Sequence, residues 1–196
     1  MEPGQITQFK QFATSLIKFT EHDLALALPY FKVRTFAAKE IIFSAGDMVN
    51  DVFFLLSGIG RYYYIDERGY ERNKSLVKYG GAFTSMSSLV EKRPSPFFTQ
   101  AIVPCNTLSV SYDDLLTLAK RNTQWAMFLL KVYERLVLKK EKREADLLLL
   151  SGQQRYQQFL REFSDEAPHI PLRQVAMYIG VTDVSLSRIR KVMGLT

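Results

Sequence analysis

The sequence is poor in the residues that carry metal, redox and covalent chemistry. Its 196 residues include one cysteine, Cys105, and two histidines, His22 and His169. A single cysteine excludes an internal disulfide and an all-cysteine iron–sulfur cluster within one chain. A haem needs a strong axial ligand, and a lone histidine is more often a surface or capping residue. We therefore expect no metal site and no cofactor, and we interpret Cys105 as a small core residue.

Long apolar runs and catalytic motifs are missing as well. No apolar segment approaches the ~20 residues that a membrane span needs, and the N-terminal stretch MEPGQITQFKQF lacks the pattern of a secretory signal. We expect a cytoplasmic protein without a membrane partner. Because the sequence contains no HExxH, GxSxG, P-loop or glycine-rich dinucleotide motif, we also expect no enzyme. The net charge of +6 tolerates an anionic partner without identifying one.

The hydrophobic period changes along the chain and divides it into units. Residues 5–18 predict a short amphipathic helix. Between residues 31 and 112, short runs rich in Phe, Tyr, Val and Ile alternate with turn residues, which favours an all-β barrel, roll or sandwich. The segment YYYIDERGYER predicts a hairpin closed around Asp66–Gly69. We assign residues 1–112 to a β unit.

A long helix is predicted over residues 113–150, which contain neither glycine nor proline. Ser111 with Asp114 forms a predicted N-terminal cap. The apolar arc is too broad for a lone surface helix, so we expect one side to pack on the β unit and the other on a second copy of the chain. The alternative is that the apolar stripe is core within one chain. The residues assigned to the dimer helix are Trp125, Leu129, Val132 and Leu136, and a second line is formed by Ala126, Leu130, Tyr133 and Val137.

Residues 151–196 predict three short helices after a hinge at Ser151-Gly152. Gly180 closes the second helix, where a left-handed turn costs glycine least, and Thr182 caps the third. Two helices joined by a glycine turn predict a helix-turn-helix, whose second helix can lie in a DNA major groove. A plain three-helix bundle with a basic surface is the alternative. The residues expected to face the interior are Leu172, Val175, Ala176, Ile179, Leu186 and Ile189.

The outward face of the last helix carries the predicted contacts to double-stranded DNA. An arginine can bond guanine O6 and N7 together, so Arg188 is the predicted base reader. Ser187, Arg190 and Lys191 are placed for phosphates. The complete set of predicted DNA-binding residues is Thr182, Asp183, Val184, Ser185, Ser187, Arg188, Arg190 and Lys191.

Two stretches of the sequence carry a resemblance to a known family. The tail, RYQQFLREF…IPLRQVAMYIGVTDVSLSRIRK, strongly resembles the DNA-binding end of the bacterial Crp/Fnr regulators, and FSAGDMVNDVFFLLSGIGRYYYID is similar to their first β-roll strands. The resemblance covers about residues 20–193. It implies an α+β fold with a cyclic-nucleotide-binding-like antiparallel β-roll of the jelly-roll type, a long dimerisation helix and a helix-turn-helix without a full wing.

The same resemblance implies the function and the partners. A homodimeric transcription regulator is expected, with double-stranded DNA, a second copy and RNA polymerase as partners. Arg188 matches the family's base-reading arginine, while Asp183 and Val184 fall where relatives read neighbouring bases. Because both differ from the best-known members, the operator sequence does not follow. A ligand-sensing protein that has lost DNA binding and acts through protein partners is the alternative.

One departure from the family concerns its phosphate cassette, in which a Gly-Glu pair binds the ribose and an Arg-Ser pair binds the cyclic phosphate. Here Ser85-Met86 and Ser95-Pro96 stand at those places. Losing a charge-assisted hydrogen bond costs ~1.5–3 kcal/mol, so we expect no cyclic AMP binding. The pocket expected for a different effector suits an apolar or aromatic ligand, and its alternative is a collapsed interior. Its expected lining is Phe83, Met86, Ser87, Ser95, Phe97 and Tyr133.

A second departure concerns the tail, where SDEAPHI alone separates two helices and no flanking hairpins are expected. Each lost phosphate contact removes about one counterion from the salt dependence of DNA binding. We expect the affinity to be modest because phosphate contacts are lost, and we expect the binding that remains to depend strongly on salt.

Overall fold

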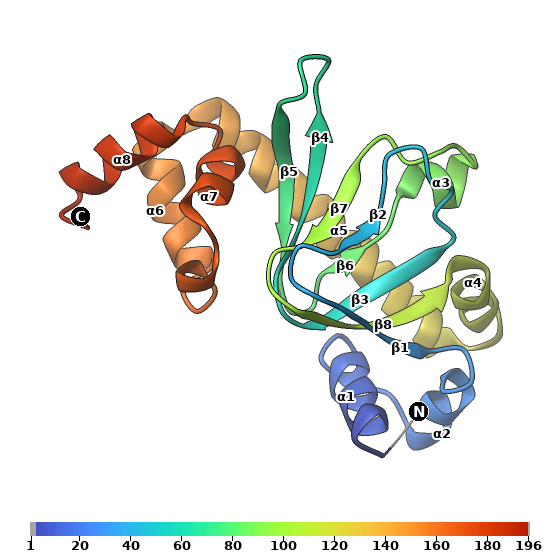
Figure 1. The fold of residues 1–196 in the computed structure, drawn as a ribbon. Coiled ribbons are helices and arrows are strands. Elements are labelled where there is room, and N and C mark those ends of the chain that lie inside the picture. The colour runs from blue at the N-terminus through green and yellow to red at the C-terminus, as the bar shows by residue number, and fades with distance from the viewer. Residues whose placement is uncertain (1–2, 196) are drawn as a thin grey trace.

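The structure, a computed structural model, describes residues 3–195 and has an α+β fold (Figure 1). Residues 1, 2 and 196, at the ends of the first and last expected units, lie outside the described residues. The first part of the chain consists of α1 (Pro3–Thr14), α2 (Glu21–Ala27), β1 (Lys32–Phe36), β2 (Ile41–Phe43), β3 (Asp51–Ser57), β4 (Gly60–Ile65), β5 (Glu71–Val77), β6 (Ala82–Phe83), α3 (Met86–Glu91), β7 (Phe98–Ala101) and β8 (Cys105–Ser111).

The strands form two antiparallel sheets of four strands each. One has the order β1-β8-β3-β6 and the other β2-β7-β4-β5. The predicted hairpin is confirmed, since β4 pairs with β5 and the Gly69 amide donates to the Asp66 carbonyl at 2.8 Å. Together the sheets make the antiparallel β-roll that the sequence predicted.

Successive side chains of a strand point to opposite faces of the sheet. The first sheet therefore contributes apolar side chains to a core on each of its two faces. Phe54 of β3 points to an aromatic cluster with the N-terminal helices, whereas its neighbour Leu55 lies in a cluster between the sheets. Cys105 belongs to this second cluster, as expected, and burial raises the pKa of its thiol to about 11.

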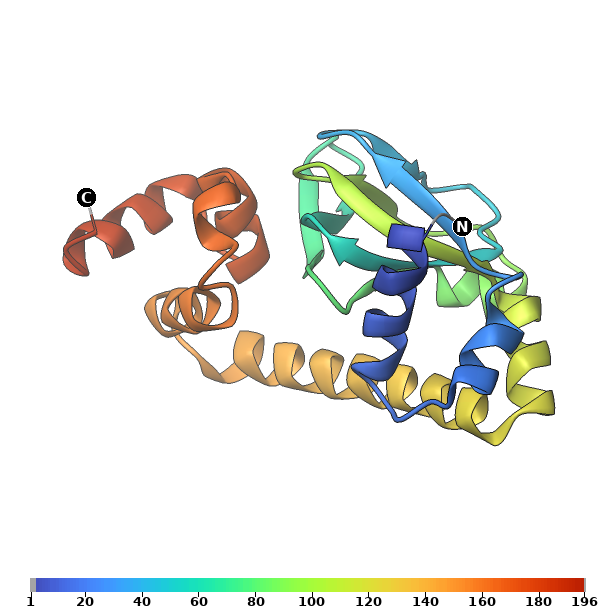
Figure 2. The ribbon, with the colours of Figure 1, turned by 90° about the horizontal axis from the view of Figure 1, so that it is seen from below.

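The predicted long helix is two helices, α4 (Tyr112–Arg121) and α5 (Thr123–Leu149). The expected cap at Ser111 is present, because its hydroxyl accepts from the Asp114 amide. Asn122 takes an extended conformation between the helices and caps α5 with its side chain, while its amide donates to Asp23 at 2.7 Å. Asparagine is a good N-cap, so it can start a new helix without a glycine or proline. The prediction of one uninterrupted helix over residues 113–150 is therefore wrong at Asn122. Figure 2 shows α5 running along the β-roll toward the last three helices.

Those last helices are α6 (Gly152–Glu162), α7 (Leu172–Ile179) and α8 (Asp183–Val192), with a short 3-10 turn at Ala167–His169. Gly180 has a φ of 71° and ends α7 in the left-handed conformation, and the Thr182 hydroxyl accepts from the Ser185 amide. Both features were predicted. Leu172 was expected inside but is exposed, because it begins α7 at the edge of the cluster. None of the described helices is long and apolar enough to cross a membrane.

Candidate nucleic-acid interface and sensor region

The outward face of α8 is set by its cap and by one buried leucine. Leu186 is buried in the cluster formed by α6, α7 and α8, and Ile189 packs against that cluster. Residues on the opposite side of the helix are therefore exposed to solvent. The exposed residues of α8 are Asp183, Val184, Ser187, Arg188, Lys191 and Val192.

Two predicted contacts do not belong to this outward face. The guanidinium of Arg190 donates to the Tyr156 hydroxyl at 2.7 Å and to the Leu195 carbonyl at 3.1 Å, so it holds α8 against α6. The expectation that Arg190 contacts phosphates is corrected for this reason. Ser185 is half-buried, and its hydroxyl lies 2.9 Å from that of Thr182 within the cap. The free face is narrower than the sequence suggested.

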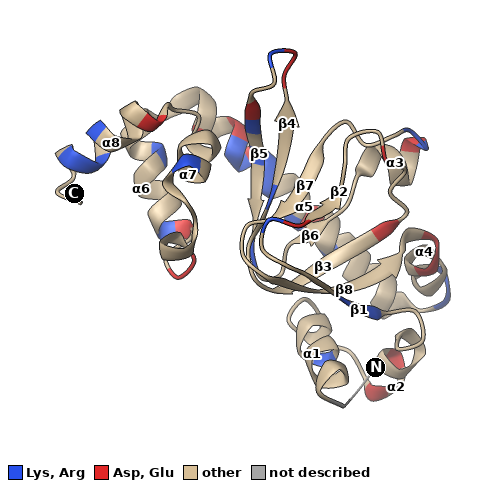
Figure 3. Cartoon of the chain, viewed as in Figure 1, with Lys and Arg blue, Asp and Glu red and all other residues tan. Residues whose placement is uncertain are grey.

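Positive charge gathers along α8, as Figure 3 shows. Arg188 and Lys191 are exposed and, among the described residues, neither forms an ion pair within the chain. Asp183 supplies the one acidic side chain of the helix, in its first turn. An exposed helix face with a free arginine and a free lysine has the polarity of a surface that can lie in a DNA major groove.

The two apolar lines of α5 have opposite environments. Trp125 is 1% exposed, and its indole nitrogen donates to the Asp23 carbonyl at 2.9 Å. Leu129 and Val132 pack against the same aromatic cluster, and Leu136 is half-buried. Of the residues assigned to the dimer helix, Trp125, Leu129 and Val132 thus lie on the side that packs on the β-roll and the N-terminal helices. The exposed apolar side chains of this helix are Met127, Leu130, Val137, Leu138, Leu147, Leu148 and Leu149.

The six residues expected to line one effector pocket are distributed over separate clusters. Phe83 and Phe97 lie in the cluster between the sheets, whereas Met86 packs against the aromatic cluster on the other face. Tyr133 is occupied by a hydrogen bond of 2.7 Å between its hydroxyl and that of Tyr112. These residues therefore lie on different sides of the first sheet. Two hollows are found at the junction of α5 and α6.

The segment that replaces the phosphate cassette is closed by its own hydrogen bonds. The buried Ser95 hydroxyl donates to the Phe97 carbonyl at 2.9 Å, and the Ser88 hydroxyl donates to the Arg93 carbonyl at 2.8 Å. Ser87 pairs with Ser85 at 2.9 Å between hydroxyl oxygens. The cation of Arg93 is exposed and lies 3.9 Å from Glu91. These serines satisfy one another and the backbone rather than presenting free donors to a ligand.

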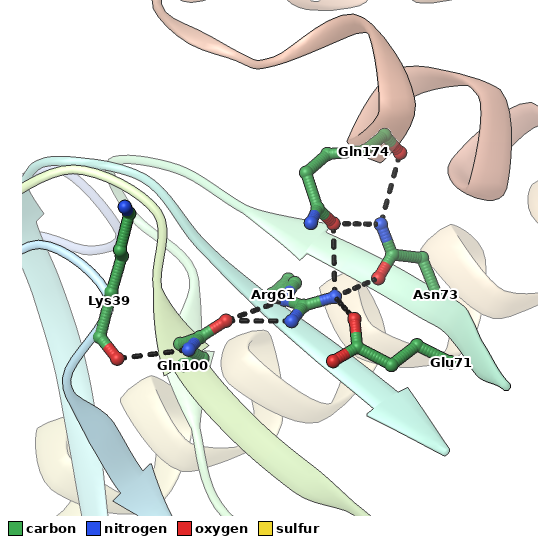
Figure 4. Close-up of polar contacts among 6 residues, drawn as sticks. All are labelled: Lys39, Arg61, Glu71, Asn73, Gln100 and Gln174. Carbon is green, nitrogen blue, oxygen red and sulfur yellow. Dashed lines mark hydrogen bonds and ion pairs between the residues drawn. The ribbon is translucent and has the colours of Figure 1, made fainter. Parts of the chain in front are cut away.

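A polar cluster that the sequence did not reveal joins the β-roll to α7 (Figure 4). Arg61 of β4 is 3% exposed, and its guanidinium lies over the Tyr63 ring at 4.0 Å. It donates to Gln100 at 2.7 and 2.9 Å and to Glu71 at 2.6 Å. The same guanidinium reaches the side-chain oxygen of Gln174, on α7, at 3.1 Å.

Asn73 of β5 completes this contact from the neighbouring strand. Its amide donates to the Gln174 backbone carbonyl at 3.0 Å and to the Gln174 side-chain oxygen at 2.8 Å. Beside it, Arg143 of α5 donates to the Tyr178 carbonyl at 3.0 Å and lies over the Tyr178 ring. We call the contact of Arg61 and Asn73 with Gln174 the hairpin clamp. Its members are dispersed in sequence and follow no motif.

Comparisons with known proteins place this geometry in context. Residues 33–122 match the family model described as the cyclic nucleotide-binding domain. A curated relative, the global nitrogen regulator of Nostoc sp., is 27% identical over 110 residues, which are 56% of this chain and 49% of the relative. The match therefore spans about half the length of that relative.

Solved structures share the fold over most of the chain. FixK2 from Bradyrhizobium japonicum matches with a TM-score of 0.71 and 17% identity, covering 84% of each chain. The regulator CLP of Xanthomonas campestris, which its description calls c-di-GMP responsive, matches with a TM-score of 0.71 and 15% identity over 89% of this chain and 92% of its own. The catabolite activator protein of Thermus thermophilus gives a TM-score of 0.55 and 22% identity, covering 91% and 85%. Residues 33–122 are therefore similar to a cyclic nucleotide-binding domain, and the chain shares its overall fold with these solved structures.

Proposed function

We propose that this protein is a DNA-binding transcription regulator that acts as a homodimer and whose β-roll does not bind cyclic AMP. The observation that carries the proposal is the free, positively charged face of α8, the second helix of a capped helix-turn-helix. Such a helix enters the major groove with its N-terminal residues against base edges. The relatives with this fold include named regulators of gene expression.

Arg188 is the proposed base reader and Lys191 a proposed phosphate contact. Binding is measured by fluorescence anisotropy on a duplex selected from a randomised pool. Arg188→Ala is expected to cost ~1–3 kcal/mol and to relax the preference at one base pair. Lys191→Ala is expected to weaken binding to all DNA sequences alike. It is also expected to lower the slope of log affinity against log salt concentration by about one.

Failure of the unmodified protein to bind any selected duplex would contradict the regulator function. In that case a sensor that acts through protein partners would be favoured. Because the linker between α6 and α7 forms a 3-10 turn and no described strand, it adds no hairpin that grips phosphates, so we expect modest affinity. The binding that remains depends on the cations of α8, so we expect it to fall strongly as salt is added. Tight binding that is insensitive to salt would contradict this part.

The proposed homodimer uses the outward side of α5. Leu130 and Val137 are exposed and seven residues apart, the repeat of a two-stranded coiled coil. Val137→Glu places a charge in this seam and is expected to give a monomer by sedimentation equilibrium. Val90 on α3 has the same 59% exposure as Val137, so Val90→Glu is the matched control and is expected to leave the dimer intact. A wild-type monomer at all concentrations would contradict the dimer.

The absence of cyclic AMP binding is supported by the closed serine segment and by the outward position of Arg93. A carboxylate for the ribose and a buried cation for the phosphate are the groups that this ligand would require. Isothermal titration with cyclic AMP and cyclic GMP is expected to show no binding. Micromolar affinity for either nucleotide would overturn this part of the proposal.

A further inference from the structure

The helix-turn-helix is attached to the β-roll by side chains of the sheet as well as through the chain connection at residues 150–152. Ile59 and Leu76, both buried, belong to the same apolar cluster as α6, α7 and α8. The hairpin clamp lies beside this apolar contact and adds direction to it. Apolar burial tolerates small rotations, whereas hydrogen bonds of Gln174 from two strands restrict them.

We propose that the hairpin clamp fixes the orientation of α7 and, through the tight turn at Gly180, that of α8. In this view Arg61 and Asn73 are positioning residues for the DNA interface, although neither touches DNA. The inference rests on the proposed function, because it concerns how two recognition helices of a dimer are held at one spacing. It adds that their spacing is set by the β4–β5 hairpin.

The clamp is placed so that the interior of the β-roll can act on it. Successive residues of a strand point to opposite faces. Arg61 reaches α7, whereas the next residue, Tyr62, packs against the cluster between the sheets. Likewise Asn73 holds Gln174, whereas Lys74 lies 3.7 Å from the centre of the Phe97 ring. A shift of Tyr62 or Lys74 would therefore move the two residues that grip α7.

The clamp leaves the DNA-facing side of α8 uncovered. Its members contact Gln174 on α7, while Arg188 and Lys191 stay exposed. It therefore cannot act by masking the recognition helix and acts on orientation instead. When one recognition helix of a dimer has bound its half-site, the second helix meets its own half-site at a high effective concentration, provided that the two helices are held at the correct spacing. A variable spacing between the helices lowers this effective concentration.

The test compares a duplex that contains two half-sites with one in which one half-site is scrambled. Gln174→Ala removes the clamp from the helix side and leaves Arg61 bonded to Gln100 and Glu71 within the sheet. We expect it to weaken binding to the two-site duplex by roughly tenfold and to leave binding to the single half-site unchanged. Gln124→Ala is the matched control. It makes the same substitution at an exposed glutamine near the start of α5, which is not a member of the clamp.

Arg61→Lys is the second variant, since lysine keeps the charge and loses the planar fork. It is expected to act like Gln174→Ala, with faster hydrogen exchange in α7 in both variants. Unchanged or tighter binding of Gln174→Ala to the two-site duplex would overturn the clamp, as would an equal loss on both duplexes. Absence of any DNA binding by the unmodified protein would instead count against the proposed function, and unchanged exchange in α7 would then reject the clamp separately.

Discussion

The two ends of α5 are held by different kinds of contact. At its beginning, Trp125 and Phe128 are buried among phenylalanines of α1 and β3, with ring centres 5.1 Å apart. Toward its end, Lys139 donates to the Leu76 carbonyl at 2.7 Å and Arg143 donates to the Tyr178 carbonyl at 3.0 Å. One end is thus fixed by aromatic burial and the other by long cationic side chains on backbone oxygens.

This difference indicates which contacts are permanent. Burial of a large aromatic side chain is worth several kcal/mol and is lost only on unfolding. Hydrogen bonds from charged groups contribute ~1.5–3 kcal/mol each, and they can be exchanged for bonds to water without unfolding. The beginning of α5 is therefore part of one folding unit with the β-roll, whereas the end beside the helix-turn-helix is suited to adjustment without unfolding.

Trp125→Ala tests the aromatic end and should have the largest effect. Removing a buried tryptophan costs ~3–5 kcal/mol because the cavity does not collapse fully. Urea unfolding followed by circular dichroism measures the loss. Met127→Ala, a nearby exposed position on the same helix, is the control and is expected to change stability little. Similar midpoints for both variants would show that this end is not the anchor.

Arg143→Met tests the polar end and should have a smaller and more local effect. The variant keeps the apolar stem but loses the hydrogen bonds to the Asn73 and Tyr178 carbonyls and the contact with the Tyr178 ring. We expect a local loss of ~1.5–3 kcal/mol, seen as faster hydrogen exchange in α6 and α7 with unchanged exchange around Trp125. Arg135→Met, at an exposed position of α5, serves as control. Equal acceleration at both ends of α5 would contradict the comparison.

Lys74→Met should have the smallest effect and depends on pH. Burial first, and the nearby Lys140 second, lower the pKa of Lys74 from the ordinary 10.5 to about 8. Between pH 8 and 10.5 the unfolded chain therefore binds more protons at this lysine than the folded chain does. The free energy of unfolding of the wild type consequently rises with pH in this range. The variant is expected to be more stable than wild type at pH 7, with the difference narrowing toward pH 10. A difference that stays constant in urea titrations across this range would rule out the effect.

Much of the fold follows from local signals in the sequence. The hairpin at Asp66–Gly69, the cap at Ser111, the left-handed Gly180 and the cap at Thr182 were each predicted and are confirmed. These features depend on residues within a few positions of one another, where turn and capping preferences are strong. The order of β-roll, long helix and helix-turn-helix follows equally from hydrophobic period and family resemblance.

The features that the sequence did not predict depend on contacts between distant segments. The helix break at Asn122 is supported by Asp23, 99 residues away. Arg61, which stands between Gly60 and three tyrosines, has the appearance of a solvent-facing residue, yet its partner Gln174 is 113 residues away. The inward side of α5 could not be chosen from periodicity, because both of its sides are apolar.

The shared apolar cluster also bears on how the protein can be dissected. Sequence composition suggests a cut at Ser151, which would separate a helical fragment from the β-roll. Ile59 and Leu76 lie in the cluster of that fragment, so the cut would remove two buried apolar side chains from its core. The helical fragment produced alone should consequently be less soluble and less cooperative in melting than the same residues within the whole chain. The unit that folds is therefore longer than the helix-turn-helix segment alone.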